Sequence, residues 1–376
     1  MEYNSLFNYL DKEEAAKFQP EISRDWKWSY KDYPDKNGLK VFSCFACGGG
    51  STMGYKLAGC DVIGCCEIDP RMNEIYQKNH NPKYNFLMDI RDFNALPNDS
   101  IPSELFDIDI LDGSPPCTTF SMVGDREKSW GKKKKFAEGQ TMQTLDDLSF
   151  VFIETVKKLR PKTVIMENVE GLLLGKAWRY VQKIYLGFED AGYYVKHFLL
   201  KGELMGIPQR RHRVFFIAIR KDLSISPDNI NLVFNYEPVT YKQIKEGDMF
   251  PISESSKFYA YIRNANDKDK SIADTRIRLG EKGNGFQTIY IRDDNVMPTI
   301  RGSWAAIIDI KALSYVSNET IRNAQTFPTD YDFGSKSRSK IGYVCGMSVP
   351  PLMIKRIMTR LIGAGVYNYR FRRTEE

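Results

Sequence analysis

A cysteine directly follows two prolines in the segment DILDGSPPCTTFS, residues 109–121. Because proline fixes φ and lacks a backbone donor, Pro115 and Pro116 hold the next residue in a rigid turn. A thiol that is presented in this way beyond a buried strand, near basic residues, can have a lowered pKa and act as a nucleophile. Free cysteines are more often inert packing residues, which is the alternative interpretation. The segment marks Cys117 as a candidate nucleophile.

Three glycines, Gly48, Gly49 and Gly50, lie between an apolar segment and a helical one. Glycines let the backbone turn tightly against a ligand, and a helix N-terminus offers free N–H groups. Glu67 ends the next apolar segment and could accept both hydroxyls of a ribose, and Asp89 could accept from an adenine amino group. A plain tight turn would explain the glycines alone, and no Gly-Lys-Ser/Thr sequence supports a triphosphate-binding loop. Together these features predict a site for an adenosine-type cofactor.

Two further polar segments flank apolar strands. Glu167 and Asn168 close the segment TVIMENV, where burial could raise the pKa of the glutamate and let it donate to a ring nitrogen. A helix cap or an ion pair is the alternative for Glu167. In GIPQRRHRVFF, Arg211 and Arg213 occupy alternate positions and are expected to share a face. They could hold phosphate or a substrate carbonyl, or form an ordinary solvated turn.

Basic residues are in mild excess, with a net charge of +6. The segment DREKSWGKKKKF, residues 125–136, follows Cys117 and has no apolar period. A basic loop of this kind could close over a phosphodiester backbone, although charge runs are more often simply solvated. The charge pattern is therefore compatible with nucleic acid without requiring it.

Cysteines and histidines offer no metal site. The chain has seven cysteines, an odd number without framework spacing, which argues against structural disulfides. Cys44 and Cys47 form a C-x-x-C sequence, but no second pair follows at zinc spacing. We expect no bound metal.

The candidate residues must be positioned by alternating strands and helices. Strand candidates cover residues 39–46, 60–69, 106–113, 162–169, 193–200 and 213–220, and the clearest helices between them cover 70–80 and 144–159. This alternation predicts an α/β fold with a doubly wound, mostly parallel sheet. Ligands bind beyond the carboxyl ends of the strands in a sheet of this kind, which is where Glu67, Cys117 and Glu167 fall.

The chain of 376 residues is long enough for one large core and a smaller domain. We expect an N-terminal extension of unassigned role (1–38), a catalytic and cofactor-binding domain (39–220), a smaller β-rich domain (221–311) and a C-terminal return to the first domain (312–376). No apolar run approaches the roughly 18 residues that span a membrane, and the N-terminus is too acidic for a secretory signal. A cytoplasmic protein is expected.

In this order the segments resemble the motifs of the C5-cytosine DNA methyltransferases of prokaryotes and phages. FACGGGSTMG is similar to the family's cofactor loop, CCEIDP and MDIRDF to its next two motifs, and GSPPCTTFS to its proline-cysteine motif. MENVEGLL and GIPQRRHRVFFIAIR are similar to the Glu-Asn-Val and Gln-x-Arg-x-Arg motifs, and LSYVSNETIRNAQTFP and GMSVPPLMIKRI to the last two. The resemblance runs from about Val41 to Gly363. It is weakest from Lys221 to Lys311, the interval that holds the family's target recognition domain.

The resemblance implies methyl transfer from S-adenosylmethionine to C5 of a cytosine in a specific duplex DNA sequence, leaving S-adenosylhomocysteine. The base must be flipped out of the stack for this chemistry. Cys117 would be the nucleophile that attacks C6, and Glu167 would hydrogen-bond N3 and the exocyclic amine. Arg213 would hold O2, and Arg211 would support the loop or a phosphate.

The resemblance also assigns residues to the cofactor and to DNA. The expected cofactor-binding residues are Phe45, Gly48, Gly49, Gly50, Glu67, Ile68, Asp89, Ile90, Pro116, Leu148, Ser348 and Val349. The expected DNA-binding residues are Ser121, Lys132, Lys133, Lys134, Lys135, Gln209, Thr299 and Arg301. Double-stranded DNA bound by a monomer is the expected partner, and no membrane is involved. The sequence leaves open whether a cognate restriction endonuclease belongs to the same system.

Three positions depart from the family pattern. Cys47 stands where the family usually has glycine, and Ile68 stands where a large apolar ring often stacks on adenine. Met347 replaces the asparagine of the usual Gly-Asn-Ser-Val. All three fall on the cofactor side, so we expect them to affect cofactor affinity before the chemistry.

Three alternatives stay open on the sequence alone. An RNA cytosine methyltransferase is one, because a close branch of the family acts on tRNA, although the long variable interval favours DNA. A non-catalytic DNA-binding regulator is another, and the intact set of Cys117, Glu167 and Arg213 argues against it. A nicotinamide-dependent oxidoreductase would account for the glycine loop and Glu67 but would leave the proline-cysteine turn unexplained.

Overall fold

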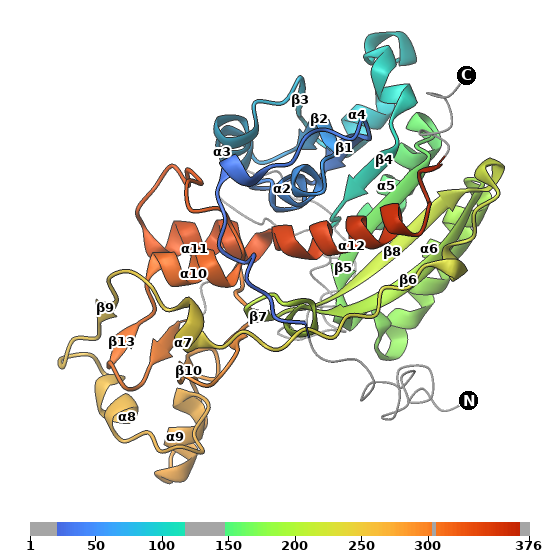
Figure 1. Ribbon diagram of the computed structural model, residues 1–376. Helices are drawn as coiled ribbons and strands as arrows, with labels where there is room; N and C mark the ends of the chain where they lie inside the picture. The colour runs from blue at the N-terminus through green and yellow to red at the C-terminus, as the bar shows by residue number, and fades with distance from the viewer. Residues whose placement is uncertain (1–20, 117–146, 303–305, 369–376) are drawn as a thin grey trace.

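A seven-stranded sheet lies at the centre of the computed structural model, which describes residues 21–116, 147–302 and 306–368 (Figure 1). Its order is β3-β2-β1-β4-β5-β8-β6. The strands are β1 (Lys40–Cys44), β2 (Asp61–Glu67), β3 (Tyr84–Leu87), β4 (Ile110–Gly113), β5 (Thr163–Val169), β6 (Tyr193–Lys201) and β8 (His212–Arg220). β8 pairs antiparallel with both β5 and β6, and the other strand pairs of this sheet are parallel. The predicted α/β fold with a doubly wound, mostly parallel sheet is confirmed.

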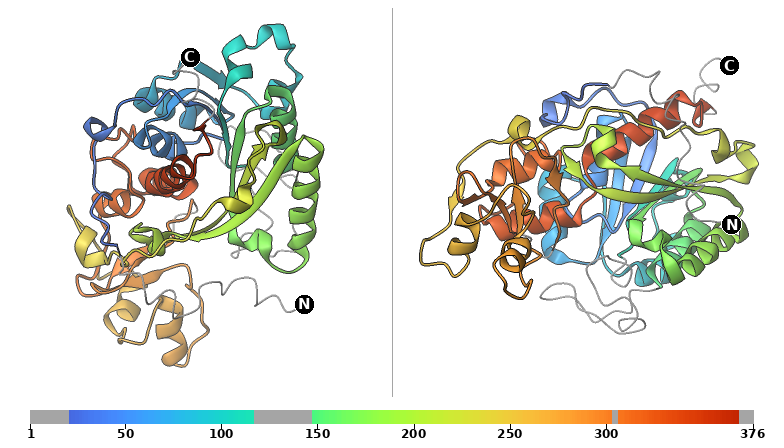
Figure 2. Two further views of the ribbon diagram at one scale, coloured as in Figure 1. Left: turned by 45° about the vertical axis from the view of Figure 1, so that its right-hand side comes forward. Right: turned by 90° about the horizontal axis from the view of Figure 1, so that it is seen from below.

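Helices cover both faces of the sheet (Figure 2). They are α2 (Gly50–Leu57), α3 (Pro70–His80), α4 (Ile90–Ala95), α5 (Leu148–Leu159), α6 (Trp178–Asp190) and α12 (Pro351–Gly363). Successive side chains of a strand point to opposite faces, so neighbouring apolar residues enter different cores. Val41 belongs to the core that contains residues of α2 and α12, and Phe42 to the core that contains residues of α5 and α6. No helix within the described residues has the length and apolar character needed to cross a membrane.

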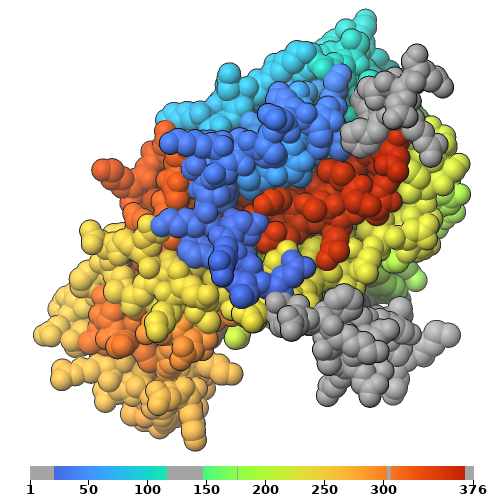
Figure 3. All heavy atoms as spheres, viewed as in Figure 1, coloured from blue at the N-terminus to red at the C-terminus, as the bar shows by residue number. Residues whose placement is uncertain are grey.

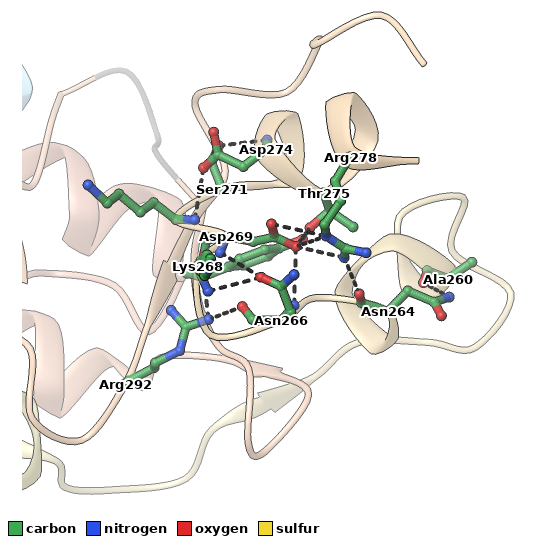
Figure 4. Close-up of polar contacts among 12 residues, drawn as sticks. Ala260, Asn264, Asn266, Lys268, Asp269, Ser271, Asp274, Thr275, Arg278 and Arg292 are labelled. Carbon is green, nitrogen blue, oxygen red and sulfur yellow. Dashed lines mark hydrogen bonds and ion pairs between the residues drawn. The ribbon is translucent and has the colours of Figure 1, made fainter. Parts of the chain in front are cut away.

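A smaller unit adjoins the carboxyl-terminal side of the main sheet. Its sheet has the order β10-β12-β13-β9, built from β9 (Phe250–Pro251), β10 (Ile289–Ile291), β12 (Ile307–Asp309) and β13 (Ser314–Tyr315). Its helices are α7 (Tyr241–Ile244), α8 (Tyr259–Arg263) and α9 (Ile272–Arg278). The buried carboxylate of Asp269 accepts hydrogen bonds from Thr275 and Arg278 of α9, which fixes the loop before that helix (Figure 4). The sheet reaches Tyr315, beyond the boundary expected at residue 311.

Two short strands join the small unit to the main sheet. β7 (Gln209–Arg210) pairs in parallel with β11 (Met297–Pro298). Helices α10 (Asn318–Ala324) and α11 (Arg338–Met347) follow, and the chain then returns to the main sheet through α12. Helix α12 thus packs on helix α2 of the main domain.

Residues 21–38, which we call the strap, cross one face of the molecule and contact α12 (Figure 3). Asp25 pairs with Arg356 of α12 at 2.7 Å, between Oδ1 and a guanidinium nitrogen. The indole N–H of Trp28 donates to the carbonyl of Thr326 at 2.8 Å. Lys27 reaches Glu246 near the small unit at 3.0 Å. The strap therefore ties segments together that are far apart in the sequence.

Candidate active site

A cleft opens at the carboxyl ends of β1, β2, β3 and β4. It contains about 760 Å³ of empty space, part of it open to solvent. The predicted cofactor-binding residues that line it are Phe45, Glu67, Ile68, Asp89, Ile90, Pro116 and Leu148. Further lining residues, not predicted from the sequence, are Cys66, Asp69, Met72, Met88, Ser114 and Tyr343. The cleft thus gathers, from several strands, carboxylates and apolar side chains that the sequence placed in separate motifs.

Glu67 is buried at the end of β2 and holds the glycine loop. Its Oε2 accepts from the backbone N–H of Cys47 at 2.7 Å, and its Oε1 accepts from the N–H of Asp69 at 2.8 Å. Burial raises the pKa of Glu67, and these backbone hydrogen bonds act against that rise. The Glu67 carboxylate therefore lines the cleft and also holds the glycine loop in place through these hydrogen bonds.

Asp89 ends the segment after β3 and caps helix α4. Its Oδ1 accepts from the backbone N–H of Arg91 at 2.8 Å, and its Oδ2 lies 3.2 Å from the guanidinium of the same residue. Residues at an N-cap accept from the first turn of their helix in this way. The cap fixes the Asp89 carboxyl in the cleft wall beside Ile90.

The glycine loop packs against the protein's own residues. Gly49 has a φ of 82°, and a Cβ added there would lie 2.0 Å from Nε2 of His80. A Cβ on Gly50 would lie 2.1 Å from the carbonyl oxygen of Val349. The Gly48 carbonyl accepts from the hydroxyl of Tyr331 at 2.6 Å. These glycines therefore allow other segments of the same chain to pack closely against the loop.

Ser348 and Val349, also expected at the cofactor, lie behind the glycine loop and do not line the cleft. The hydroxyl of Ser348 donates to the carbonyl of Val344 at 2.8 Å, which closes the end of α11. Both residues are buried. Their position indicates that they support the loop from behind.

The three departures from the family pattern all lie in the cleft lining, as Cys47, Ile68 and Met347. Cys47 has a φ of 47°, a left-handed conformation that favours glycine. Met347 also packs on Gly302, where an added Cβ would lie 2.5 Å from its sulfur. Substitution at these positions has therefore changed the cleft wall itself.

Glu167 and Arg213 form an ion pair beside the proline turn. The Nε of Arg213 lies 2.7 Å from Oε1 of Glu167, and the two side chains are only 14% and 12% exposed. The next residue, Asn168, donates from Nδ2 to the carbonyl of Pro115 at 3.4 Å. The ion pair that the sequence offered as an alternative for Glu167 is present, and it joins two of the predicted catalytic side chains.

Several predicted residues lie outside the described part of the chain. They are Cys117, Ser121, Lys132, Lys133, Lys134 and Lys135. The described turn ends at Pro116, one residue before the candidate nucleophile.

Arg211 does not share the environment of Arg213, contrary to the expectation of a common face. It is 3% exposed, and its guanidinium donates to the carbonyls of Ile300 at 3.0 Å, Gly346 at 3.0 Å and Ser348 at 2.9 Å. Burial lowers its pKa. Of the two roles considered, support of a loop fits this position, and contact with phosphate does not.

Gln209 was expected at the DNA, and the structure corrects this expectation. Its side chain is fully buried, donating to Ala324 and Gln325 and accepting from the backbone N–H of Ile300 at 2.9 Å. A side chain with every polar group engaged inside the protein does not contact DNA. The other two described candidates, Thr299 and Arg301, flank Ile300 and are half-buried.

Comparisons with known proteins agree with one another. A family model for C-5 cytosine-specific DNA methylases matches residues 39–363. The chain is 33% identical to the Type II methyltransferase M.FnuDI of Fusobacterium nucleatum over 207 residues, which are 55% of this chain and 53% of that protein. It is 26% identical to M.NgoFVII of Neisseria gonorrhoeae over 361 residues, covering 89% of each. The matched region spans about half the length of M.FnuDI but most of M.NgoFVII.

Solved structures share the fold. A Spodoptera frugiperda DNMT2 mutant superposes with a TM-score of 0.60 over 86% of this chain and 100% of that chain, at 16% identity. The Entamoeba histolytica methyltransferase EhMeth gives a TM-score of 0.57 over 87% of this chain and 99% of that chain, at 15% identity. At such low identity the likeness concerns architecture alone.

Proposed function

The chain belongs to the C-5 cytosine-specific DNA methylase family, and on that basis we propose that it transfers a methyl group from S-adenosylmethionine to C5 of cytosine in a specific duplex DNA sequence. The observation that carries the proposal is the Glu167–Arg213 ion pair, held next to the proline turn whose Pro116 lines the cleft. A regulator that had lost catalysis would have no need to keep this half-buried pair at that point.

The cleft lining fits an adenosine-containing cofactor. Glu67 and Asp89 offer carboxylate oxygens for ribose hydroxyls and an exocyclic amine, as in other doubly wound nucleotide sites. Ile68, Ile90 and Leu148 offer apolar surface for the faces of a purine ring. S-adenosylmethionine bound there would supply the methyl group.

The protein's own groups would carry the steps on the base. In the proposed mechanism Cys117 adds through its thiolate to C6 of a flipped cytosine, and this makes C5 nucleophilic. Glu167 would hydrogen-bond N3 and the exocyclic amine, and Arg213 would hold O2. Because O2 is attached to C2, the ring carbon next to N3, two side chains 2.7 Å apart are suitably placed to contact both atoms. Once C5 has taken up the methyl group, loss of the C5 proton to a water molecule would re-form the C5–C6 double bond and expel the Cys117 thiolate.

The small unit is proposed to recognise the DNA sequence. The small unit is joined to the main sheet by the pairing of β11 with β7, and β7 lies just before Arg213 in the sequence. The relatives M.FnuDI and M.NgoFVII are Type II methyltransferases, so we also propose a role in restriction and modification, with a cognate endonuclease as partner. The enzyme would act as a monomer in the cytoplasm, where the DNA is.

Bisulfite sequencing of DNA from cells that express the chain tests this proposal. We expect full methylation at one short recurrent sequence, and none in cells that express Cys117→Ala, because an alanine methyl group cannot add to C6. DNA affinity of the purified variant should survive, because it comes mostly from phosphate contacts. Methylation by Cys117→Ala would contradict the assignment of the nucleophile. Methyl transfer to tRNA but not to duplex DNA would establish the RNA alternative instead.

A further inference from the structure

A buried carboxyl group beneath the cleft takes no part in the mechanism above. Asp112 is 2% exposed and belongs to β4, two residues before Ser114 in the cleft lining. The hydroxyl of Ser43 donates to its Oδ2 at 2.7 Å, and the hydroxyl of Tyr55 donates to its Oδ1 at 3.0 Å. Both donors are themselves buried. The carboxylate is thus held by two neutral hydroxyl groups.

The strand that carries Asp112 runs through the apolar interior of the sheet. Ile110 and Leu111, the preceding residues of β4, are fully buried in the two cores of the sheet. A second carboxylate, Glu167, lies close enough to oppose ionisation of Asp112. A buried carboxylate held by neutral groups costs free energy that an apolar side chain at the same place would not. A structural role alone would be served as well by leucine or valine.

Three walls of the cleft converge on this carboxyl. Ser43 lies in β1, two residues before Phe45, which lines the cleft. Tyr55 lies in α2, the helix that begins at Gly50 of the glycine loop. Asp112 itself leads directly into the Ser114–Pro116 turn. One side chain therefore connects the strand below the loop, the helix after the loop and the turn that precedes the candidate nucleophile.

We propose that Asp112 is a positioning residue, whose ionised carboxyl holds β1, α2 and the Ser114–Pro116 turn in the arrangement that binds the cofactor, so that cofactor affinity depends on its ionisation. The proposal rests on the proposed function only in taking S-adenosylmethionine as the ligand. An ionised carboxyl accepts from both hydroxyls at once. A protonated one carries its own O–H, so the hydroxyl that faces this O–H can no longer donate to that oxygen and must rearrange.

The surroundings place this ionisation in an accessible pH range. Burial raises the pKa of Asp112 to about 7, against the hydrogen bonds from Ser43 and Tyr55. The other groups that face it from neighbouring elements are Cys44 of β1, Ser51 of α2, Tyr76 of α3 and Glu167 of β5. The cofactor arrangement should accordingly be intact above about pH 7 and weaken below it.

Calorimetric titration of the full-length protein with S-adenosylmethionine between pH 6 and pH 8 tests the proposal. For the wild type we expect affinity to fall by roughly tenfold from pH 8 to pH 6. This corresponds to a change of about one unit in the pKa of one carboxyl group when the cofactor binds. Asp112→Asn cannot ionise, so it should bind weakly at both pH values with a flatter profile. Because burial also raises the pKa of Glu67, the profiles are compared between variants.

Asp109→Asn is the matched control. Asp109 is a fully buried carboxyl just before the other end of β4, where it accepts from the backbone N–H of Lys40 at 2.9 Å and pairs with Lys162 at 3.2 Å. Its loss should lower stability and leave the pH profile of cofactor binding as in the wild type. A change of profile in this variant would show that general loosening of β4 is enough, and would overturn the proposal.

Tyr55→Phe decides the question if Asp112→Asn does not fold. It removes one donor to the carboxylate, so the pH at which affinity is half lost should rise. Profiles of both variants that coincide in shape with the wild type would overturn the role of Asp112 while leaving the proposed function intact. Failure of the wild type to bind S-adenosylmethionine at any pH would instead count against the proposed function.

Discussion

Arg211 and Arg213 are separated in the sequence by a single residue, but they have different partners. Arg211 donates to three backbone carbonyls from segments that lie far beyond it in the sequence, around residues 300 and 346–348. Arg213 pairs with Glu167 on the neighbouring strand β5. A guanidinium presents several donors in a fixed fork, so it can satisfy several carbonyls that no single backbone group could reach. Arg211 therefore joins segments of the chain, whereas Arg213 pairs with Glu167 and has a proposed role at the substrate.

We expect substitutions of Arg211 and Arg213 to show their main effects in different assays. Arg211→Ala leaves buried carbonyls without a donor, so we expect a loss of about 3 kcal/mol or more in the free energy of unfolding. Arg213→Ala should cost about 1–2 kcal/mol, because its side chain keeps some contact with solvent, yet it should abolish methyl transfer. Chemical denaturation and a labelled-cofactor assay measure the two effects. Equal stability of the two variants would contradict the division of roles.

At the level of the element, the glycine loop is fixed by a buried histidine. His80 ends α3, and burial lowers its pKa to about 3, so the ring is neutral at physiological pH. Its ring nitrogen Nε2 lies 3.4 Å from the carbonyl of Gly48. The rings of Tyr76 and Tyr331 lie next to the imidazole, with centroids 4.7 Å and 6.5 Å from it. The loop between β1 and α2 thus packs against aromatic side chains that leave no room for a Cβ at Gly49.

Gly49→Ala should be far more destabilising than Gly175→Ala. Both glycines have positive φ, 82° and 59°, so alanine costs roughly 1–2 kcal/mol at either position. A Cβ at Gly175 meets nothing within 4 Å, whereas at Gly49 it would meet the His80 ring. We expect a further loss of about 1–3 kcal/mol from overpacking at Gly49 alone.

Urea denaturation of the two alanine variants measures this difference. Adding His80→Ala to Gly49→Ala should recover part of the extra loss, because it removes the atoms that the new Cβ meets. No recovery in the double variant, or equal cost at the two glycines, would mean that the loop does not rest on His80 as described.

The elements that the sequence predicted well are those whose pattern is local. Each central strand is a short apolar run that ends at a polar residue, and this is visible in LKVFSC or TVIMEN without any knowledge of the fold. Placing Glu67 and Asp89 in one cleft needed only the rule that ligands bind beyond the carboxyl ends of parallel strands.

The residues that sequence reasoning placed wrongly or missed depend on distant partners. Gln209 is buried because residues 300 and 324–325 dock on it, and nothing near Gln209 in the sequence indicates this. Tyr343 lines the cleft because α11, which follows the small unit in the sequence, packs over the cleft. A spacing of four residues between Tyr343 and Met347 would place both on one helix face, but it does not identify what that face contacts.

On the scale of the whole molecule, the strap holds segments that the main sheet does not connect. Burial by itself would raise the pKa of Asp25, but the guanidinium of Arg356 and the ammonium of Lys355 hold it at about 2. The pKa is thus below its ordinary value of 3.8. A carboxyl with a depressed pKa contributes stability that is fully present above its unfolded value and is lost as the pH falls.

Asp25→Asn should therefore destabilise the protein at pH 7 and lose this effect in acid. We expect about 1 kcal/mol at neutral pH, a modest value because the side chain is about a third exposed and solvent screens the pair. The gap to the wild type should narrow as the pH falls from 4 towards 2. Urea unfolding at a series of pH values measures it, with the exposed Asp99→Asn as control. A gap that is independent of pH would show that the ion pairs do not account for it.

The small unit should carry sequence specificity as a transferable part. Exchange of residues 249–315 for the counterpart of a relative, with Met297–Ile300 kept, should change the methylated sequence and retain methyl transfer. Keeping that stretch preserves the pairing with β7 and the contacts of Ile300 with Gln209 and Arg211. Bisulfite sequencing gives the site, and the same chimera with Cys117→Ala is the inactive control. An active chimera that methylates the original sequence would contradict the assignment.

The cleft has walls from both ends of the chain, and this has a consequence for biosynthesis. Phe45 and Glu67 line the cleft together with Tyr343 and Met347, which a ribosome would release much later. Helix α12, which packs on α2 of the glycine loop, follows later still. Contacts between segments so distant in the sequence form late, after loop closure has been achieved. The nascent chain can therefore build most of its sheet during translation, but the cleft can accept a ligand only after α11 has emerged from the ribosome.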